Sequence, residues 1–449
     1  MRFRKTRSAI LAVVAGAAAA VAGLSGAASA APASQFSVVN GAITAAKGTP
    51  VPASGTQASL WSDSSYATTT IDGSGRVQIG AIGDNCQGWP TIRVTADGTL
   101  LGDTTIVSAT QYGTYPVGPA LGAGTHTIKI QLVNDLQTTV CDRNVHIAYA
   151  RMETPVTDTT FSFAVMPDTQ QEVLNASDTR FKNRTDWLVA NRSALDLRFV
   201  THSGDVVNWD TPDHSQYVIA RNAMRSLETA KIPYSLAIGN HDTQATGVGG
   251  SARDPEHTRE LVRDTSVFNQ YFTAAQYGAV KGQFETGKVD NSYSTYDAGG
   301  VHWLVLTLEL WPRTEVVDWA KGVVAANPHH NVVVVTHDYI DANANIEQSG
   351  SYGANSPQYL YDNLIKQYAN IKFVFSGHVG VAGNRVDTGV HGNKIYSFLQ
   401  TFHSNTTNPV RLVEIDTKAD SVRTWIYGPY NNQSFTEYDR SFTTIGLVR

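Results

Sequence analysis

Apolar and polar residues alternate along much of the first third of the chain, a pattern typical of β-strands with one buried face. Within residues 36–152 the clearest such segments are RVQIGAI, TIRVTADGTLL, TYPVGPAL and THTIKIQLVND. Asp97-Gly98 and the glycine-rich residues 122–124 are expected to form turns between them. No helical repeat is convincing here, so residues 36–152 are predicted to form an all-β sandwich.

The pattern changes after a short polar, proline-containing segment, ETPVTDTT, which predicts a linker at residues 153–160. Beyond it, apolar runs typical of buried strands alternate with amphipathic segments typical of helices. The expected helices cover residues 181–196, 214–231, 316–328 and 356–370, and the chain closes with the strands KIYSFLQTF, VRLVEID and SVRTWIYG. Residues 161–449 are therefore predicted to form an α/β domain with buried sheets.

The first thirty residues indicate export. A basic start, MRFRKTR, precedes an apolar run rich in alanine and an A-x-A pattern at residues 28–30, as in a secretory signal peptide. A membrane anchor is the alternative, but the run ends in a cleavage pattern and no later segment approaches ~20 uninterrupted apolar residues. We expect residues 1–30 to be removed and the mature protein to be soluble and extracellular.

Composition narrows the function classes. The 449 residues are 42% hydrophobic, which is enough for a sizeable core, and the formal net charge of -5 offers no broad basic field for nucleic acid. The chain has two cysteines, Cys86 and Cys141. In an exported protein such a pair predicts a disulfide, with free thiols as the alternative. Two cysteines alone cannot form a thiolate zinc site.

Polar residues gather where five of the expected strands end. The clusters are PDTQ, SGDVVN, GNHD, THD and SGH. In α/β sheets, functional groups collect beyond the carboxyl ends of strands, where several loops converge. Asp, Asn and His supply the ligands that Zn, Mn or Fe accept. Two adjacent cations with a bridging carboxylate can clamp a phosphoryl group, so the clusters point to a dimetal site.

The ordered set D…GD…GNH(D)…H…GH resembles the calcineurin-like metallophosphoesterase superfamily, over about residues 160–449. The resemblance implies a four-layer αββα sandwich. The metal ligands it implies are Asp168 for the first metal, Asp205 as the bridge, and Asn240, His337 and His378 for the second metal. It implies that His241 protonates the leaving group, with Asp242 as an acidic partner that orients His241 and raises its pKa.

The chain departs from this pattern at the first metal. The usual Asp-x-His reads Asp168-Thr169-Gln170, and the usual Gly-His-x-His ends in Gly380. A neutral glutamine oxygen is a poorer zinc ligand than histidine. Either the first metal is held weakly through Asp168, Gln170, Asp205 and water, or a residue from elsewhere fills the gap. Our candidate for that residue is His403 in LQTFHS.

A second resemblance concerns the first domain. GDNCQGWPTIRVTADG, GTHTIKIQLVND and CDRNVHI resemble the calcium-dependent carbohydrate-binding modules of the xylan-binding type. The resemblance implies a disulfide between Cys86 and Cys141, calcium ligands at Asp135 and Asp142, and Trp89 near the sugar-binding surface. The alternative is a β-sandwich that only stabilises the protein, with Trp89 in its core.

These observations lead us to expect a secreted phosphoesterase that depends on two divalent metal ions. It would hydrolyse phosphate mono- or diesters with a metal-activated hydroxide and be targeted to polysaccharide by a calcium-binding first domain. The alternative is an extracellular carbohydrate-binding protein whose phosphoesterase domain is degenerate and inactive. The sequence names neither the ester nor the metals.

Overall fold

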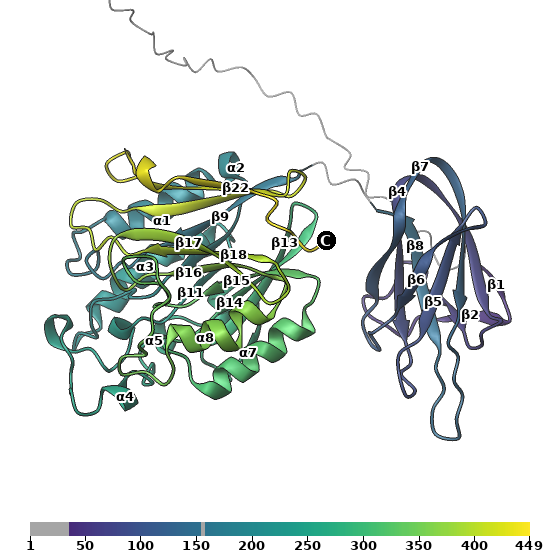
Figure 1. The fold of residues 1–449 in the computed structure, drawn as a ribbon, viewed down its shortest axis with the longest axis horizontal. Coiled ribbons are helices and arrows are strands. Elements are labelled where there is room, and N and C mark those ends of the chain that lie inside the picture. The colour runs from purple at the N-terminus through teal and green to yellow at the C-terminus, as the bar shows by residue number, and fades with distance from the viewer. Residues whose placement is uncertain (1–35, 154–157) are drawn as a thin grey trace, which may run out of the picture. The chain divides into compact units, whose positions relative to one another are not determined.

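The computed structural model describes residues 36–153 and 158–449 and divides into two compact units, Met1–Pro155 and Val156–Arg449 (Figure 1). The predicted signal peptide and the middle of the predicted linker lie outside the described residues. Each unit has its own buried core. Within the described part of the chain, we find no helix with the length and apolar character needed to cross a lipid bilayer.

The N-terminal unit is a β-sandwich. Its strands are β1 (Ser37–Val39), β2 (Gly41–Ala45), β3 (Thr56–Leu60), β4 (Tyr66–Gly83), β5 (Thr91–Ala96), β6 (Thr99–Thr105), β7 (Gly113–Leu132) and β8 (Val145–Met152). They pair in the order β2-β3-β8-β4-β7-β5-β6, with β1 beside β4. The alternating pattern of β5, in which every second residue is buried, matches the sequence prediction.

Two long strands, β4 and β7, run through the whole N-terminal unit. Their first pairing region, residues 66–73 with 124–131, is flanked by β1 and β5, whereas the second, residues 75–81 with 113–121, is flanked by β8. The predicted turn at residues 122–124 is therefore wrong. Because Gly73 faces Gly124 across a register shift, β7 continues through these glycines and joins the two predicted strands into one.

The C-terminal unit contains two seven-stranded sheets. The first has the order β11-β10-β9-β19-β20-β21, with β22 beside β20, and consists of β9 (Thr160–Met166), β10 (Leu197–His202), β11 (Tyr234–Leu236), β19 (Val410–Asp416), β20 (Ser421–Gly428), β21 (Gln433–Ser434) and β22 (Arg440–Thr443). The second has the order β12-β13-β14-β15-β16-β18-β17 and consists of β12 (Val280–Gln283), β13 (Ser292–Ala298), β14 (Val301–Thr307), β15 (His330–Val335), β16 (Ile371–Ser376), β17 (Ala382–Thr388) and β18 (Lys394–Gln400).

The helices of this unit are short. They are α1 (Arg180–Ala190), α2 (Arg192–Leu195), α3 (Ser215–Thr229), α4 (Thr258–Leu261), α5 (Phe268–Tyr271), α6 (Ala274–Tyr277), α7 (Thr314–Ala326) and α8 (Pro357–Asn363). The helix predicted at residues 181–196 is interrupted at Asn191, and α8 ends seven residues earlier than predicted. The start of α8 follows local chemistry, since Ser356 accepts a hydrogen bond from the Tyr359 amide and Pro357 needs no partner.

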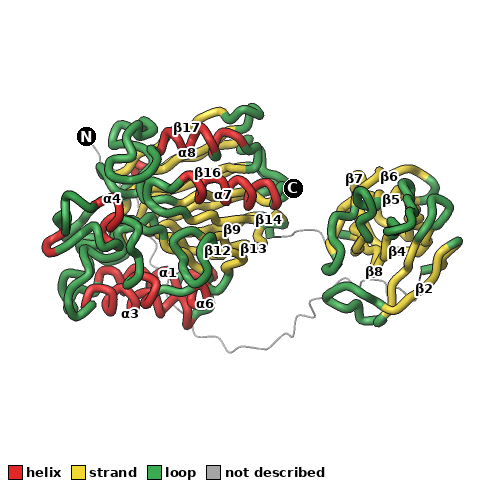
Figure 2. Tube along the Cα trace, turned by 90° about the horizontal axis from the view of Figure 1, so that it is seen from below, coloured by secondary structure: helices red, strands yellow, loops and turns green. Residues whose placement is uncertain are grey.

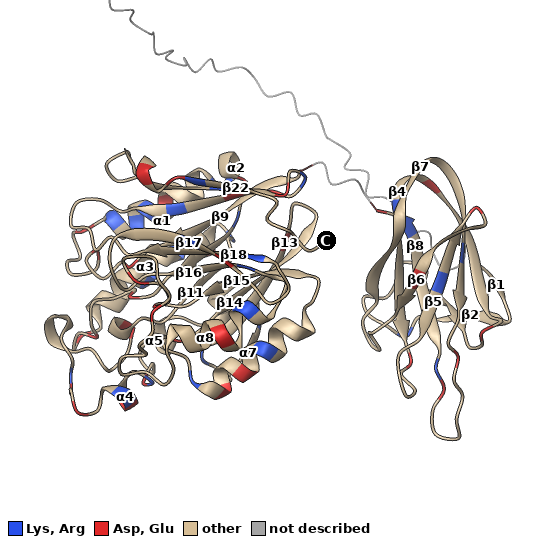
Figure 3. Cartoon of the chain, viewed as in Figure 1, with Lys and Arg blue, Asp and Glu red and all other residues tan. Residues whose placement is uncertain are grey.

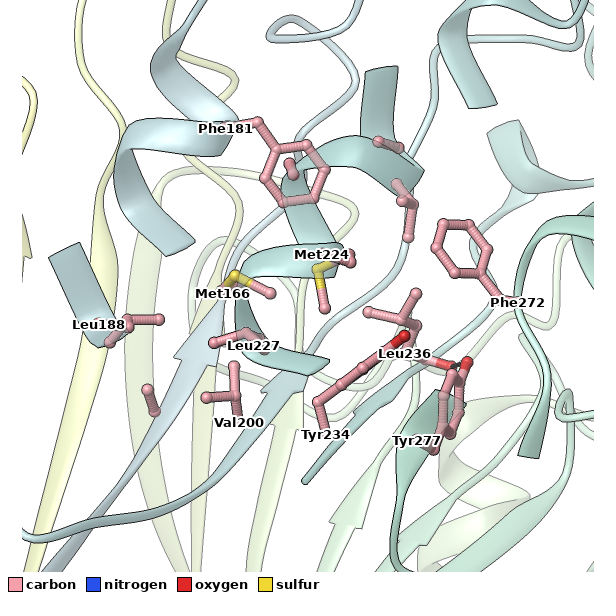
Figure 4. Packing of buried hydrophobic residues seen from close by; sticks show 14 of the residues in the cluster. Met166, Phe181, Leu188, Val200, Met224, Leu227, Tyr234, Leu236, Phe272 and Tyr277 are labelled. Carbon is pink, nitrogen blue, oxygen red and sulfur yellow. Dashed lines mark hydrogen bonds between the residues drawn. The ribbon is translucent and has the colours of Figure 1, made fainter. Parts of the chain in front are cut away.

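Alternate residues of each central strand face opposite cores, which produces four layers. In β9, Ala164 and Met166 pack in one core with residues of α1 and α3, while Phe163 and Val165 pack between the two sheets. Helices α7 and α8 cover the second sheet (Figure 2). Figure 4 shows Met166 lying against Met224 of α3. The αββα sandwich expected from the sequence is confirmed.

Charged residues of both signs are interspersed over both units (Figure 3). Helix α7, for example, carries Glu315, Asp318 and Lys321, and Lys321 pairs with Asp318 at 2.8 Å.

Candidate metal centre

Polar side chains from both sheets meet at the carboxyl ends of parallel strands. Strands β9, β10 and β11 of the first sheet are parallel, as are β15, β16 and β18 of the second. The loops after these six strands carry Asp168, Asp205, Asn240, His337, His378 and His403. Contacts between Asp168 and two of these histidines join the sheets across this edge.

Asp205 lies at the centre of the cluster. It is 1% exposed, and its Oδ2 lies 3.2 Å from His337 Nε2 and 3.9 Å from His241 Nε2. Its Oδ1 accepts a hydrogen bond from the His241 amide at 3.0 Å. A buried carboxylate with ligand atoms on both sides has the position that a bridge between two cations requires.

The ligands predicted for the second metal come from loops of both sheets and lie beside Asp205. One ligand atom each from Asp205, His337 and His378 lie within 4.8 Å of one another. His378 Nδ1 is 3.2 Å from His337 Nε2. The Asn240 side-chain oxygen is buried and accepts no hydrogen bond from a described residue. An orphaned buried oxygen costs about 1–3 kcal/mol, so this atom is suited to a bound cation.

The ligands predicted for the first metal lie where the sequence departs from the expected motifs. One ligand atom each from Asp168, Asp205 and His403 lie within 4.8 Å of one another. His403 Nε2 is 3.2 Å from Asp168 Oδ2. The Gln170 side-chain oxygen is buried and, like that of Asn240, accepts no hydrogen bond from the described part of the chain. The structure therefore brings His403 beside Asp168, where the sequence predicts the first metal, and leaves the side-chain oxygen of Gln170, two residues from Asp168, without a donor.

The glycines of the sequence motifs make room for these side chains. A Cβ on Gly239 would lie 2.0 Å from Asp205 Oδ1 and 2.4 Å from the Asp205 amide nitrogen. A Cβ on Gly377 would lie 2.1 Å from Asp168 Oδ1. Such distances are far below van der Waals contact, so only glycine permits the backbone to approach these carboxylates.

The charges of the cluster are strongly coupled. Burial tends to raise the pKa of Asp205, but the histidines His337 and His241 lower it below its ordinary value. Burial tends to lower the pKa of His337, but Asp205 and Asp168 raise it to about 10. Burial raises the pKa of Asp168 itself. Two buried carboxylates side by side create a negative potential that favours a cation.

His241 is held by a backbone carbonyl. Its Nδ1–H donates to the Asn208 carbonyl oxygen at 2.5 Å, which leaves Nε2 on the side of Asp205. Asp242 has another role than the one expected from the sequence. Its Oδ1 and Oδ2 accept hydrogen bonds from the amides of Val207 and Gly239, at 3.1 and 2.9 Å. The observed hydrogen bond to the His241 ring thus comes from the Asn208 carbonyl, while the Asp242 carboxylate faces two backbone amides.

Burial, together with the nearby Asp205, raises the pKa of Asp242 to about 7. Through its hydrogen bond to the Val207 amide, Asp242 also connects the loop that carries Asn208 to the turn that carries His241.

An aromatic residue that the sequence did not single out lies against His378. Trp311 is 2% exposed, and its ring centroid is 5.7 Å from that of His378, with the rings at 90°. Its Nε1–H donates to Asp338 Oδ2 at 2.7 Å. Asp338 directly follows the predicted ligand His337, and this position was a signal in the sequence. The sequence did not indicate that its partner is Trp311, 27 positions away.

Arg180 ties the loop after β18 to the loop after β9. Its guanidinium donates to the Ser404 carbonyl and, at 2.8 Å, to the Gln171 carbonyl. These acceptors directly follow His403 and Gln170. One buried arginine therefore holds both residues that stand near Asp168.

A second arginine strengthens this connection. Arg184 is fully buried, pairs with Glu172 and donates to the Asn408 carbonyl at 3.1 Å. The loop between these contacts and β18 is strained, since Phe402 and His403 have φ of 67° and 43°. Left-handed conformations of such residues cost about 1–3 kcal/mol each and persist where the surroundings impose them.

The N-terminal unit has a polar cluster of its own. Cys86 and Cys141 form the expected disulfide. Beside it, Asp135, Asp142 and Asn144 each have a buried side-chain oxygen without a hydrogen-bond donor in the described chain. Burial and the nearby carboxylates of Asp142 and Asp63 raise the pKa of Asp135. Several unpartnered oxygens close together fit a hard cation such as calcium.

Trp89 lies near this cluster. Its side chain is half-buried, and its carbonyl accepts a hydrogen bond from the Asn134 side chain at 3.0 Å. Asn134 also accepts from the Thr91 amide at 2.6 Å. The loop carrying Trp89 is thus fixed next to the residue that precedes Asp135.

Two protein-family models match this chain, one mainly in each unit. Residues 161–382 match the family model of calcineurin-like phosphoesterases, and residues 76–164 match that of a Ca-dependent, xylan-binding carbohydrate-binding module. Both resemblances seen in the sequence are thereby confirmed. An uncharacterized protein of Bacillus subtilis (strain 168), YvnB, is 24% identical over 290 residues, which cover 62% of this chain and 20% of that protein. The chain thus spans about a fifth of the length of this relative.

Similar solved structures exist for each unit. A dimetal phosphatase from Danio rerio, 12% identical, aligns with a TM-score of 0.40 over 64% of this chain and 99% of its own. A carbohydrate-binding module, CBM36, in complex with calcium and xylotriose, also 12% identical, aligns with a TM-score of 0.22 over 27% of this chain and 97% of its own.

Proposed function

We propose that this chain, whose residues 161–382 form a calcineurin-like phosphoesterase domain, hydrolyses phosphate mono- or diesters outside the cell. The observation that carries the proposal is the pair of ligand clusters that share the buried Asp205, with His241 directly beside it. Carboxylate, imidazole and amide donors suit Zn, Mn or Fe.

The site residues have two proposed roles, metal binding and proton transfer. Asp168, Asp205, Gln170 and His403 would hold one divalent cation, and Asp205, Asn240, His337 and His378 the other. Bound cations would supply positive charge for the phosphoryl oxygens and a water of lowered pKa. His241, fixed through Nδ1, would bind a phosphoryl oxygen and donate a proton from Nε2 to the leaving oxygen.

The alternative, a carbohydrate-binding protein with an inactive phosphoesterase domain, is not favoured. Its main support in the sequence is the absence of two histidines from the first metal motifs. His403, 3.2 Å from Asp168, supplies an imidazole at this position from another strand. His241 also keeps a fixed orientation that binding alone would not need.

Hydrolysis of p-nitrophenyl phosphate and bis(p-nitrophenyl) phosphate by the full chain tests the proposal. Activity should disappear after metal removal by a chelator and return with Mn²⁺ or Zn²⁺. The two substrates separate monoesterase from diesterase activity. A metal-loaded protein that leaves both substrates intact would refute the proposal.

His403→Ala should reduce the number of tightly bound divalent ions from two per chain to one, because Asp168 and Asp205 then lose the one imidazole of their cluster. Gln170→His should act in the opposite direction and tighten zinc binding, since imidazole is a better zinc ligand than an amide oxygen. Metal titration followed by elemental analysis measures both. The exposed His391 gives the control variant His391→Ala. Unchanged stoichiometry in His403→Ala would leave His403 without a ligand role.

We further propose that the N-terminal unit binds polysaccharide with calcium. The match to a Ca-dependent xylan-binding module supports this, as do the unpartnered oxygens of Asp135 and Asp142. Asp142→Asn should weaken calcium binding and retention on a xylan affinity gel, whereas Asp72→Asn, at an exposed aspartate, should change neither. Equal retention of both variants would contradict calcium-dependent binding through this cluster.

Secretion remains part of the proposal. The predicted signal peptide precedes the described residues, and the Cys86–Cys141 disulfide is a bond that persists in oxidising compartments.

A further inference from the structure

A pocket of about 540 Å³ opens beside His241. Two segments, residues 209–214 and 247–253, supply its walls, which include Trp209, Asp210, His214, Val248 and Arg253. Both segments adjoin His241. Asn208, which precedes the first, accepts the Nδ1–H of His241, and a Cβ on Gly250 of the second would lie 3.1 Å from His241 Cε1. His241 itself does not line the pocket, but both wall segments adjoin it, through Asn208 and Gly250.

The polar side of the pocket is a chain of hydrogen-bonded side chains. Arg253 donates to the Gln244 side-chain oxygen, and Gln244 Nε2 donates to Asp210 Oδ2 at 3.3 Å. His214 Nδ1–H donates to Asp210 Oδ1 at 2.6 Å. Because these groups hold one another in place, a ligand would have few side chains to order on binding. The exposed Arg253 guanidinium has five N–H donors and uses one on Gln244 and one, at 3.5 Å, on the Thr246 carbonyl, so further donors are available to a ligand.

The other side of the pocket is apolar. Trp209 presents a half-buried indole, and Val248 is 77% exposed at the rim. The pocket therefore offers one aromatic surface next to both donors and acceptors. A sugar matches this combination, because its hydroxyl groups both donate and accept while the C–H face of its ring packs on an aromatic side chain. A carboxylate such as Asp210 has four acceptor positions and uses two of them here.

We propose that this pocket binds the sugar portion of a phosphorylated carbohydrate, so that the preferred leaving group of the reaction is a sugar hydroxyl. The inference rests on the proposed phosphoesterase function. Water would add to phosphorus, the bond between phosphorus and the sugar oxygen would break, and that oxygen would take a proton from His241. The match of the first unit to a carbohydrate-binding module supports it independently, because such a module would keep the chain where sugars are concentrated.

Three substrates with a primary alkyl leaving group test the pocket: glucose 6-phosphate, adenosine 5′-monophosphate and ethyl phosphate. The wild-type chain should have its highest kcat/KM with glucose 6-phosphate. Arg253→Ala and Trp209→Phe should each reduce the preference for glucose 6-phosphate over ethyl phosphate by about tenfold, the effect of ~1.4 kcal/mol of binding free energy. Arg259→Ala, at an exposed arginine outside the pocket wall, should leave the preference unchanged.

Higher kcat/KM with the adenosine ester would overturn the proposal in favour of a nucleobase site. An equal loss on glucose 6-phosphate and ethyl phosphate would also overturn it. If the wild type hydrolyses none of the three esters, p-nitrophenyl phosphate and bis(p-nitrophenyl) phosphate decide separately on the phosphoesterase proposal, and saturation-transfer NMR with methyl glucoside decides on the pocket. A weaker sugar signal in Arg253→Ala than in the wild type, with the N-terminal unit identical in both, would support sugar binding. Equal signals would exclude it.

Discussion

Replacing His241 by alanine is expected to lower kcat by ~10²–10⁴-fold, because positioned proton transfer contributes about that much to enzymatic rates. Its imidazole is fixed through Nδ1 by Asn208, with Nε2 3.9 Å from Asp205. The bond from residue 241 to Asp205 comes from the backbone amide and survives the substitution. The bound metals should therefore stay in place while the proton donor is lost.

The leaving group separates this role from a structural one. p-Nitrophenolate departs without a proton, whereas an alkoxide needs one, so His241→Ala should impair ethyl phosphate hydrolysis more than p-nitrophenyl phosphate hydrolysis. Metal content measured on the same sample should equal that of the wild type. His391→Ala, at an exposed histidine, is the matched control. An equal loss on both substrates, or a loss of metal, would contradict proton donation.

Gly239→Ala should weaken metal binding by ~10–100-fold, the effect typical of changes that displace a metal ligand indirectly. The new Cβ would lie 2.0 Å from Asp205 Oδ1 and 2.4 Å from its amide nitrogen, so Asp205 or the turn that carries Asn240 must shift. Overpacking of this kind costs about 1–3 kcal/mol. Calorimetric titration with Mn²⁺ and a thermal melt of the metal-free chain measure the two effects.

Gly322→Ala is the control for this substitution. Gly322 lies on the exposed side of α7, and a Cβ there would have no atom within 4 Å. Alanine at this helical position should stabilise the protein by about 0.5–1 kcal/mol and leave metal affinity unchanged. If Gly239→Ala binds metal as tightly as Gly322→Ala, the glycine is not required for the geometry of Asp205.

The convergence of the ligands was predictable because it follows from the direction of strands. Apolar runs followed by Asp168, Asp205 and His337 predict parallel strands, and parallel strands bring their carboxyl ends to one edge. His403 was a candidate because of the family resemblance, which implies that the closing strands lie near the last motif. The alternation of strands and helices predicted an α/β domain with buried sheets, whereas the four layers were implied by the family resemblance.

Other features had no signal in the sequence. The bond between His241 and Asn208 joins a side chain to a backbone carbonyl 33 positions away, and any residue type supplies such a carbonyl. The family resemblance implied that Asp242 orients His241, but its carboxylate instead accepts hydrogen bonds from the amides of Val207 and Gly239. The turn predicted at residues 122–124 was wrong because glycine allows either a turn or a bend within a strand, and the partner strand β4 decides between them.

His403 reaches Asp168 from 235 positions away in the chain, where no motif that starts from Asp-x-His would look for it. Motif inspection alone finds the first metal site incomplete, since both expected histidines are missing. If His403 binds the first metal as proposed, the loop after β18 supplies the imidazole that the two motifs lack. In relatives whose last motif reads Gly-His-x-Gly, the loop after β18 should therefore be inspected for a histidine before the protein is classified as inactive.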